Sequence, residues 1–470
     1  MLSYKEKICE YVIARKSEIV ETLKELLRIP SVRGEAEEEA PFGKECARAL
    51  EYTKALYEKY GFDTELDADG GYLLSYFGEG KHILGIFAHS DVVPAGEGWT
   101  LTTPFEPKEI DGFLVGRGVM DDKAAIITSL YSARIIKELN IPFSSRLVLF
   151  TGSAEESGMG DIKNYLKRHT PPDFSLVPDT CFPLYRGNKG RILMRAKRNV
   201  LLGEIKSLVG GEGGTNVGEA VARLDFNEEL FKYLKNKATD SLFVTQKNGE
   251  IILSAKGLAK HTALPEGSVN AVSLIADALR NCEFLSEETR DVCAFLYGIC
   301  SDYYGGYVGI SCDDSDFGKL TFVNYGINAD ESIVELDFNI RYGASIDREK
   351  MKATLAERFS EYGFNIEILN ESMPHAVPAD HPVLKSLMNT YEVYTGNKGE
   401  MYVNAGGTYA QLLPCAAEIG VSLRGGRPEG LPQGHGAVHQ PDECISIDGL
   451  LEAIELTSLM LINCDRELNK

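Results

Sequence analysis

Acidic and imidazole side chains follow three short apolar runs of the sequence. The runs 83–88, 146–150 and 174–177 lead into His89-Ser90-Asp91, Ala154-Glu155-Glu156 and Pro178-Asp179, and a fourth acidic group, Asp121-Asp122, lies between the first two. Carboxylates and imidazoles without nearby cysteine are typical ligands of a hard-to-borderline divalent metal. Two ions about 3.5–4 Å apart need a shared carboxylate, and Asp121 is placed to provide it.

The elements that would position these side chains are buried strands and a helix. The three runs are continuously apolar, as expected for strands buried on both faces of an α/β sheet. After Asp121-Asp122, Ile127, Tyr131, Ile135 and Leu139 recur at four-residue spacing, which predicts a helix with one of the two aspartates as its N-cap. Ligands of open α/β sheets bind beyond the carboxyl ends of the strands, so the polar groups are expected to converge on one crevice.

Each of these residues also has an ordinary explanation. An aspartate at a helix start is more often a cap than a ligand. A Glu-Glu pair is usually solvated, and a single histidine usually has a purely structural role. The coincidence of all four groups within one block of about 100 residues favours the metal site.

The length of the chain and the changes in its sequence pattern predict two domains, the second inserted into the first. A chain of 470 residues exceeds what one hydrophobic core normally organises. From about Gly187 the pattern becomes β-rich, including strand-like segments 191–198 and 332–341, and from about Pro382 helical segments resume and end with a helix over 447–463. We expect an α/β catalytic domain with a mixed, largely parallel sheet flanked by helices over 1–187 and 381–470, and an inserted α+β lid domain over 188–380.

Composition excludes several classes of partner. The hydrophobic fraction of 44% and the charged fraction of 25% are those of an ordinary globular protein. A net charge of −21 repels phosphate backbones and anionic lipids, so neither nucleic acid nor a membrane is expected as a partner. No apolar run approaches the length of a membrane span, and the first residues lack the pattern of an export signal. A cytoplasmic location is therefore expected.

Two long motifs carry a resemblance to a known family. The runs His-Ser-Asp-Val-Val-Pro-Ala-Gly-Glu-Gly-Trp over 89–99 and Gly-Arg-Gly-Val-Met-Asp-Asp-Lys over 116–123 resemble the M20 metallopeptidases. Within that family they are most similar to the PepV-like dipeptidases, including the manganese-dependent Sapep type. The resemblance extends from Ile-Pro-Ser-Val at 29–32 to His-Gln-Pro-Asp-Glu at 439–443, and it implies a zinc-peptidase-like fold.

The resemblance implies a role for each residue of the metal site. Asp121 would bridge two ions, one of them also held by His89 and Asp179, and the other also held by Glu156 and His439. The resemblance also implies a cis peptide between Asp121 and Asp122. His435, four residues before His439, is an alternative ligand, which the His-Gln-x-Asp-Glu context disfavours.

Two further residues would act beside the ions. Glu155 would be the general base, because its neighbour is occupied by metal while Glu155 is free to accept a proton from water and pass it to the leaving amine. Asp91 would accept the second N–H of His89 and fix the tautomer of this ligand.

The resemblance also implies substrate-binding residues. His261 would stabilise the oxyanion, Asn216 and Arg341 would contact the substrate from the lid, and the backbone of Gly406 and Gly407 would bind its carboxylate. For Arg341 the ordinary alternative is a surface arginine. The chain departs from the family pattern twice, at 216–218, where a proline is missing, and at 186–190, where Arg-Gly-Asn-Lys-Gly replaces the common Glu-Lys-Gly.

These inferences predict a metal-dependent dipeptidase that acts on unblocked dipeptides. Its cofactors would be two divalent ions per chain, Zn²⁺ or Mn²⁺, with Co²⁺ as a third candidate. The size of the lid resembles that of the monomeric dipeptidases, so a monomer is expected. Two alternatives remain: a deacylase of N-acyl-amino acids or succinyl-diaminopimelate with the same metal site, and a non-catalytic peptide-binding protein.

Overall fold

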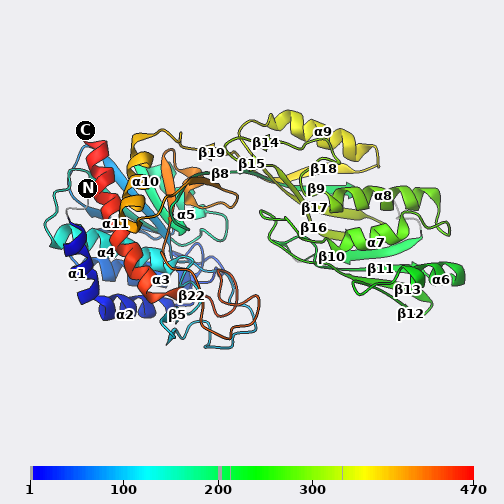
Figure 1. Ribbon diagram of the computed structural model, residues 1–470, viewed down its shortest axis with the longest axis horizontal. Helices are drawn as coiled ribbons and strands as arrows, with labels where there is room; N and C mark the ends of the chain where they lie inside the picture. Colours follow the sequence, from blue (N-terminus) through cyan, green and yellow to red (C-terminus); the bar gives the residue numbers. More distant parts are fainter. Residues whose placement is uncertain (1–3, 200–203, 212, 331) are drawn as a thin grey trace. The chain divides into compact units, whose positions relative to one another are not determined.

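The protein is described by a computed structural model that covers residues 4–199, 204–211, 213–330 and 332–470. The chain folds into two compact units (Figure 1). Unit 1 comprises Met1–Asn188 and Ala376–Lys470, and unit 2 comprises Lys189–His375. Within the described residues, no helix combines the length and the apolar character that crossing a bilayer requires.

Unit 1 is built around a mixed sheet whose strands follow the order β1-β2-β6-β3-β7-β21-β8-β19, with β20 paired to β8. The central neighbours β6, β3, β7 and β21 run parallel, whereas β1 and β2 pair antiparallel at one side. The strands are β1 (Asp63–Asp67), β2 (Tyr72–Phe77), β3 (Ile83–His89), β6 (Arg146–Gly152), β7 (Phe174–Thr180), β8 (Leu184–Asn188), β19 (His375–Ala376), β20 (Met401–Asn404) and β21 (Ala416–Gly420). The predicted mixed, largely parallel sheet is thus confirmed.

Helices cover both faces of this sheet. They are α1 (Lys5–Ala14), α2 (Lys16–Leu27), α3 (Lys44–Lys59), α4 (Lys123–Glu138), α5 (Gly160–Arg168), α10 (Pro382–Thr395) and α11 (Ile447–Leu468), with the 3-10 turn η1 (Tyr409–Leu412). A three-stranded sheet, β4 (Lys108–Ile110), β5 (Phe113–Val115) and β22 (Cys444–Ser446), joins the first and last parts of the unit. The N-terminal segment forms two helices, because the chain turns at Arg15, whose N–H bonds to the carbonyl of Val12.

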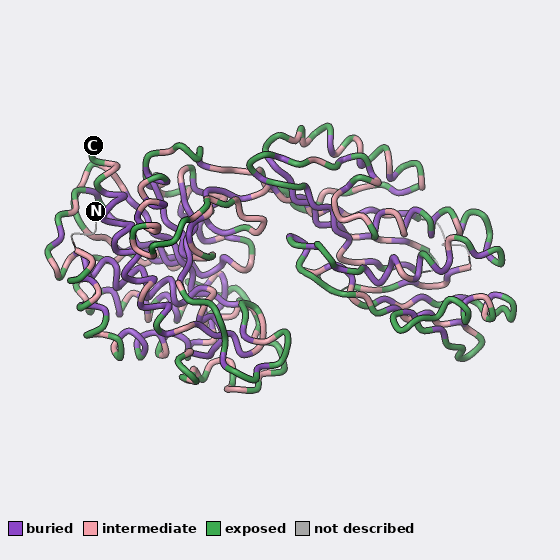
Figure 2. Tube along the Cα trace, in the orientation of Figure 1, coloured by how far each residue is buried: buried purple, intermediate pink, exposed green. Residues whose placement is uncertain are grey.

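The alternation of side chains along the central strands explains both helical layers. Leu84 and Ile86 of β3 point to the face covered by α4 and α11. Phe87, on the opposite face, packs in a cluster with Tyr165 of α5 and with Tyr409. Because both faces are covered, the central strands are buried along their length, as Figure 2 shows for the interior of unit 1.

Unit 2 is an antiparallel sheet with helices on one face. Its strands follow the order β12-β13-β11-β10-β16-β17-β9-β18. In β9, Ile192, Met194 and Ala196 point into the core, whereas Arg195 and Lys197 lie on the more exposed face. The strands are β9 (Gly190–Arg198), β10 (Ile205–Gly210), β11 (Glu219–Asp225), β12 (Leu242–Lys247), β13 (Glu250–Lys256), β16 (Thr321–Ala329), β17 (Val334–Tyr342) and β18 (Asn365–Ser372), with the small hairpin β14 (Asp313–Asp314) and β15 (Gly318–Lys319). The helices are α6 (Glu228–Lys237), α7 (Ala271–Leu279), α8 (Glu287–Ser301) and α9 (Arg348–Ser360).

Candidate active site

Three parallel strands deliver the predicted acidic and imidazole groups to one edge of the unit 1 sheet. His89 is the last residue of β3, Glu155 and Glu156 follow β6, and Asp179 lies near the end of β7. Asp121 precedes α4 and is joined to Asp122 by a cis peptide bond, as the resemblance implied. The carboxyl ends of these neighbouring strands meet because β3 pairs in parallel with both β6 and β7.

The five predicted metal ligands form two groups that share Asp121. His89 Nε2 lies 3.1 Å from Asp121 Oδ1 and 3.9 Å from Asp179 Oδ2. His439 Nε2 lies 3.0 Å from Asp121 Oδ2 and 2.8 Å from Glu156 Oε1. In each group the candidate ligand atoms all lie within 4.8 Å of one another. The two oxygens of Asp121 therefore face different imidazoles.

His89 is held so that one ring nitrogen is directed into this cluster. Its side chain is buried, and its Nδ1 donates to the backbone carbonyl of Asp91 at 2.9 Å. The Asp91 carboxylate is farther away, with Oδ1 3.4 Å from Nδ1. The backbone carbonyl of Asp91 makes the shorter contact with this nitrogen, and its carboxylate, for which the contact was predicted, lies further away. The other ring nitrogen, Nε2, faces the carboxylates of Asp121 and Asp179, which suits a metal ligand.

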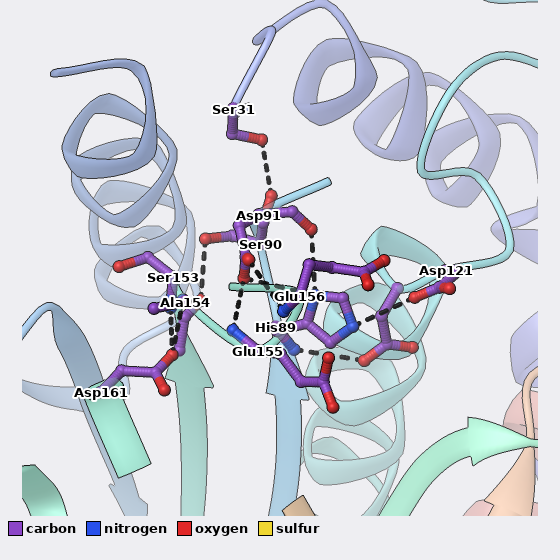
Figure 3. Close-up of polar contacts among 12 residues, drawn as sticks. Ser31, His89, Ser90, Asp91, Asp121, Ser153, Ala154, Glu155, Glu156 and Asp161 are labelled. Atoms are coloured by element: carbon purple, nitrogen blue, oxygen red, sulfur yellow. Dashed lines mark hydrogen bonds and ion pairs between the residues drawn. The ribbon is translucent and has the colours of Figure 1, made fainter. Parts of the chain in front are cut away.

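The carboxylate of Asp91 instead holds the loop that carries the two glutamates. Its two oxygens accept the backbone N–H groups of Glu155 at 3.1 Å and Glu156 at 3.2 Å. Figure 3 shows the contacts of Asp91 with His89 and with this loop. Glu155 is itself buried, and its Oε1 has no hydrogen-bond partner in the part of the chain that the structure describes. Asp91 therefore holds both the candidate ligand His89 and the loop that carries the candidate base Glu155.

The electrostatics of the cluster fit a bound cation. Burial and the neighbouring carboxylates raise the pKa values of Glu155, Glu156 and Asp179. Burial acts in the same direction on Asp121, but the two histidines outweigh it and lower the pKa of this carboxyl. Hydrogen bonds to Asp121 and Glu156 raise the pKa of His439 to about 10. So many buried carboxyl groups ionise together only beside positive charge, which divalent ions would supply. The residues present therefore fit a divalent metal site.

The structure separates the two candidate histidines near the C-terminal end. His439 lies beside Asp121 and Glu156, while His435 Nδ1 lies 2.8 Å from Asp442 Oδ2. Asp442 also accepts the N–H groups of Thr100 and Leu101. His435 therefore contacts Asp442, which holds the segment of Thr100 and Leu101. It belongs to neither of the two candidate metal-binding groups.

Glu443 was not singled out from the sequence, although it fixes the loop of the shared aspartate. Its Oε1 accepts the N–H groups of Met120 at 2.9 Å and Asp121 at 3.2 Å, and its Oε2 accepts from Arg117 at 2.6 Å and Gly118 at 3.1 Å. Glu443 and Arg117 are both buried. The only sequence signal was the position of Glu443 four residues after His439.

Replacing Glu443 by glutamine is expected to weaken metal binding about 10–100-fold, as for other residues that orient ligands. The new amide N–H₂ must face either the N–H groups of Met120 and Asp121 or the Arg117 guanidinium, and all of these are donors. Metal titration of the chelated protein measures the effect. Glu452→Gln is a matched control, because Glu452 pairs with Arg424 on the surface. Equal affinity in both variants would contradict the assigned role.

Asp161 also supports the glutamate loop and gave no sequence signal. Its buried carboxylate accepts the N–H groups of Ser153 at 2.6 Å and Ala154 at 2.7 Å (Figure 3). The hydroxyl of Tyr409 donates to the same carboxylate, and the Tyr409 ring packs edge-on against His89. The loop before Glu155 is therefore fixed by a second carboxylate besides that of Asp91.

The predicted carboxylate-binding glycines lie in a loop of unit 1 that is braced by side chains. The N–H of Gly406 donates to Asn404 Oδ1 at 2.7 Å, and its carbonyl lies 3.4 Å from Asn188 Nδ2. Gly407 follows. Behind the loop, the buried carboxylate of Glu418 accepts from Asn188, Asn404 and Thr408. Burial raises the pKa of Glu418 to about 7.

This raised pKa predicts a pH-dependent loss of stability. The folded protein holds the Glu418 proton more tightly than the unfolded chain, whose pKa is near 4.5. The neutral form therefore favours folding at low pH, and that contribution, about 3 kcal/mol, is lost as pH rises from 4.5 through 7. Thermal unfolding of the metal-free protein should show Glu418→Gln gaining stability relative to wild type between pH 5 and pH 8. The exposed Glu429→Gln should show no such trend, and parallel pH profiles for wild type and Glu418→Gln would refute the raised pKa.

Unit 2 gathers the other predicted substrate residues around the end of β17. Asn216 is buried, and its amide accepts the N–H of Lys260 at 2.7 Å and donates to the carbonyl of Leu258 at 3.3 Å. His261, which follows Lys260, is exposed. The next residue, Thr262, accepts a hydrogen bond from Asn339 on β17 at 3.0 Å. Asn216 and Asn339 therefore fix the His261 segment from two sides.

Arg341 lies on the same face of β17 as Asn339, two residues further along. It is only 5% exposed, so the alternative of a solvated surface arginine is wrong. Burial and the neighbouring Arg191 lower the pKa of Arg341 to about 10. A buried guanidinium in this environment suits the binding of an anionic group.

Comparisons with known proteins point to one family. A sequence model described as peptidase family M20/M25/M40 matches residues 85–463. The Bacillus subtilis (strain 168) protein named "Putative dipeptidase YtjP" is 33% identical over 462 residues, covering 95% of this chain and 96% of its own length. A Staphylococcus aureus (strain MRSA252) protein, "Putative dipeptidase SAR1836", is 28% identical over 96% of this chain and 97% of its own.

Solved structures share the fold at low sequence identity. Human carnosine dipeptidase 1 has a TM-score of 0.61 and 14% identity, and the match covers 99% of both chains. The dipeptidase Dug1p from Saccharomyces cerevisiae has a TM-score of 0.59 and 13% identity, again over 99% of both chains. These likenesses confirm the predicted fold class.

Proposed function

The chain belongs to peptidase family M20/M25/M40, and from this premise we propose that it is a two-metal dipeptidase acting on unblocked dipeptides. It is a hydrolase of peptide bonds, and this membership sets aside a purely binding role. The observation that carries the proposal is the sharing of Asp121 between two histidine–carboxylate groups, with Glu155 next to Glu156 of one of them. The dipeptidase name of the relatives supports the substrate class.

Asp121, whose two oxygens face different imidazoles, would be the ligand shared by two divalent ions. His89 and Asp179 would complete one half of the site, and Glu156 and His439 the other. Imidazole and carboxylate ligands accept Zn²⁺, Mn²⁺ or Co²⁺. When bound, such a pair polarises the scissile carbonyl and lowers the pKa of water.

Glu155 is proposed to move the proton. Its buried Oε1 is not occupied by a described neighbour, and burial together with nearby carboxylates raises the pKa of this side chain. A carboxylate with a raised pKa accepts a proton from water and returns it to the leaving amine. Asp91 would keep Glu155 and Glu156 aligned through their N–H groups.

The proposal gives unit 2 the role of a lid that recognises the substrate. His261 would donate a hydrogen bond to the oxyanion, an effect of about 3–4 kcal/mol in comparable sites. Asn216, which holds Lys260 next to it, would set the direction of this histidine and approach the substrate. Arg341 would grip the free C-terminal carboxylate, with Gly406 and Gly407 of unit 1 supplying backbone contacts. We assign residues 1–187 and 381–470 to catalysis and 188–380 to the lid, bounds that lie close to those of units 1 and 2, and we expect a cytoplasmic monomer.

A substrate panel tests this function. The purified protein, reconstituted separately with Zn²⁺, Mn²⁺ and Co²⁺, is offered unblocked dipeptides and the corresponding N-acetyl and N-succinyl amino acids. Hydrolysis of the dipeptides at much higher kcat/KM is the expected result. Exclusive cleavage of the acylated compounds would replace the dipeptidase by the deacylase with the same metal site.

A further inference from the structure

Glu418 is a buried carboxylate for which the proposed chemistry has no use. It lies on β21 with no exposed surface, and three donors of unit 1 reach it. Its Oε1 accepts from Asn188 Nδ2 at 2.5 Å and from Thr408 Oγ1 at 2.7 Å, and its Oε2 accepts from Asn404 Nδ2 at 2.8 Å. Burying a carboxylate is costly, so such a residue is retained where its contacts serve a purpose.

The contact with Asn404 determines how this side chain can bind the glycine loop. An amide has one donor end and one acceptor end. Because the donor Nδ2 of Asn404 faces Glu418, the acceptor Oδ1 is turned toward the N–H of Gly406, which it binds at 2.7 Å. The carboxylate of Glu418 thus fixes the conformation of the backbone immediately before Gly407.

The remaining two donors reinforce the same loop. Asn188 donates to Glu418 and lies 3.4 Å from the carbonyl of Gly406, so it touches the second polar group of that glycine. Thr408 donates its hydroxyl to Glu418, and the same oxygen accepts the N–H of Ala410. Residues on both sides of Gly407 are therefore tied to one carboxylate.

We propose that Glu418 is a positioning residue for substrate recognition, which fixes the Asn404 amide so that the N–H of Gly407 is presented to the C-terminal carboxylate of the dipeptide. The N–H of Gly406 is committed to Asn404, so Gly407 supplies the donor and Gly406 shapes the loop. This assignment rests on the proposed dipeptidase function, because the donor is assigned to the free C-terminal carboxylate of a dipeptide.

The polarity of Glu418, rather than its size, is what the loop requires. A glutamine at this position would keep an oxygen for Asn188 and Thr408 but would place its N–H₂ against Asn404 Nδ2. Two donors 2.8 Å apart force the Asn404 amide to turn over, which presents its donor end to the N–H of Gly406. To restore the contacts of position 404 with position 418 and with the N–H of Gly406, the side chain at 404 would have to accept both hydrogen bonds.

Exchanging the carboxylate of position 418 and the amide of position 404 tests the proposal. Wild type, Glu418→Gln, Asn404→Asp and the double variant are compared with bound Mn²⁺ on an unblocked dipeptide and on the same dipeptide amidated at its C-terminus. In Glu418→Gln the KM for the free acid should rise about tenfold, the effect of one misdirected hydrogen bond, with a smaller change in kcat and little change for the amide. Asn404→Asp should be similarly impaired, because two carboxylates would then face each other.

The double variant should recover most of the wild-type KM. The amide introduced at position 418 can donate to the carboxylate introduced at position 404, and that carboxylate can also accept the N–H of Gly406, so both original contacts are replaced. Thermal unfolding and metal content identify variants that do not fold. If a single variant does not fold, the double variant decides: recovery supports the proposal, and failure to recover overturns it.

Two further results distinguish failure of this proposal from failure of the proposed function. An unchanged or lower KM in Glu418→Gln would overturn the proposal. A lower KM would mean that charge repulsion between Glu418 and the substrate carboxylate dominates. A wild type that hydrolyses no unblocked dipeptide would instead overturn the proposed function, and this assignment with it.

Discussion

Replacing Glu155 by alanine is expected to lower kcat by about 10²–10⁴-fold, the usual contribution of a general acid–base residue, while both metal ions remain bound. Glu155 lies outside the two candidate metal-binding groups, and its Oε1 has no hydrogen-bond partner among the described residues. Its removal therefore takes away the proton acceptor without removing a ligand. Steady-state kinetics together with metal analysis of the same sample measures both effects.

The neighbouring glutamate provides the matched control. Glu156→Ala removes a carboxylate whose Oε1 lies 2.8 Å from His439 Nε2, so this variant should lose metal as well as activity. Both side chains belong to the same loop, whose N–H groups Asp91 holds. Near-normal turnover in Glu155→Ala, or loss of metal from it, would show that the base has been wrongly assigned.

Replacing Asp121 by alanine is expected to disrupt both halves of the metal site, with a loss of activity at least as large as that for Glu155→Ala. The two oxygens of Asp121 lie 3.1 Å from His89 Nε2 and 3.0 Å from His439 Nε2. Removing this one carboxylate also leaves the two imidazoles without the group that joins them. Metal content per chain and residual kcat measure the effect.

Asp179→Ala is the corresponding control, because Asp179 belongs only to the group of His89. This variant should retain one ion more readily than Asp121→Ala. If the Asp121 variant kept two tightly bound ions, Asp121 could not be the shared ligand.

Much of the sheet and of the candidate metal site could be predicted from the sequence because both depend on local patterns. Continuous apolar runs marked β3, β6 and β7, and the polar residues after them share an edge because neighbouring parallel strands end together. His89, Glu156 and Asp179 were placed by that rule alone. The pairing of His439 with Glu156 depended on the family resemblance, because 283 positions separate them.

The residues that hold the site in shape could not be predicted in the same way. Glu443, Asp161 and Glu418 each bind donors contributed by other segments, so their roles depend on tertiary contacts. In a chain with 70 acidic residues, nothing in the local sequence distinguishes Asp161 and Glu418 from solvated side chains, and the one signal for Glu443 is its place in the motif that contains His439. Asp91 was predicted to orient His89 through its carboxylate, whereas its backbone carbonyl makes the shorter contact. Whether the backbone or the side chain of Asp91 lies closer to His89 depends on the turn geometry after β3.

The two-metal dipeptidase is tested most directly by counting bound ions while turnover is measured. The chelated protein is titrated with Mn²⁺ or Zn²⁺, and bound metal per chain is followed together with hydrolysis of an unblocked dipeptide. We predict that activity reaches its full value only when two ions per chain are bound, with Asp121→Ala failing to recover. Full dipeptide hydrolysis with a single ion, or with none, would contradict the two-metal site built on Asp121.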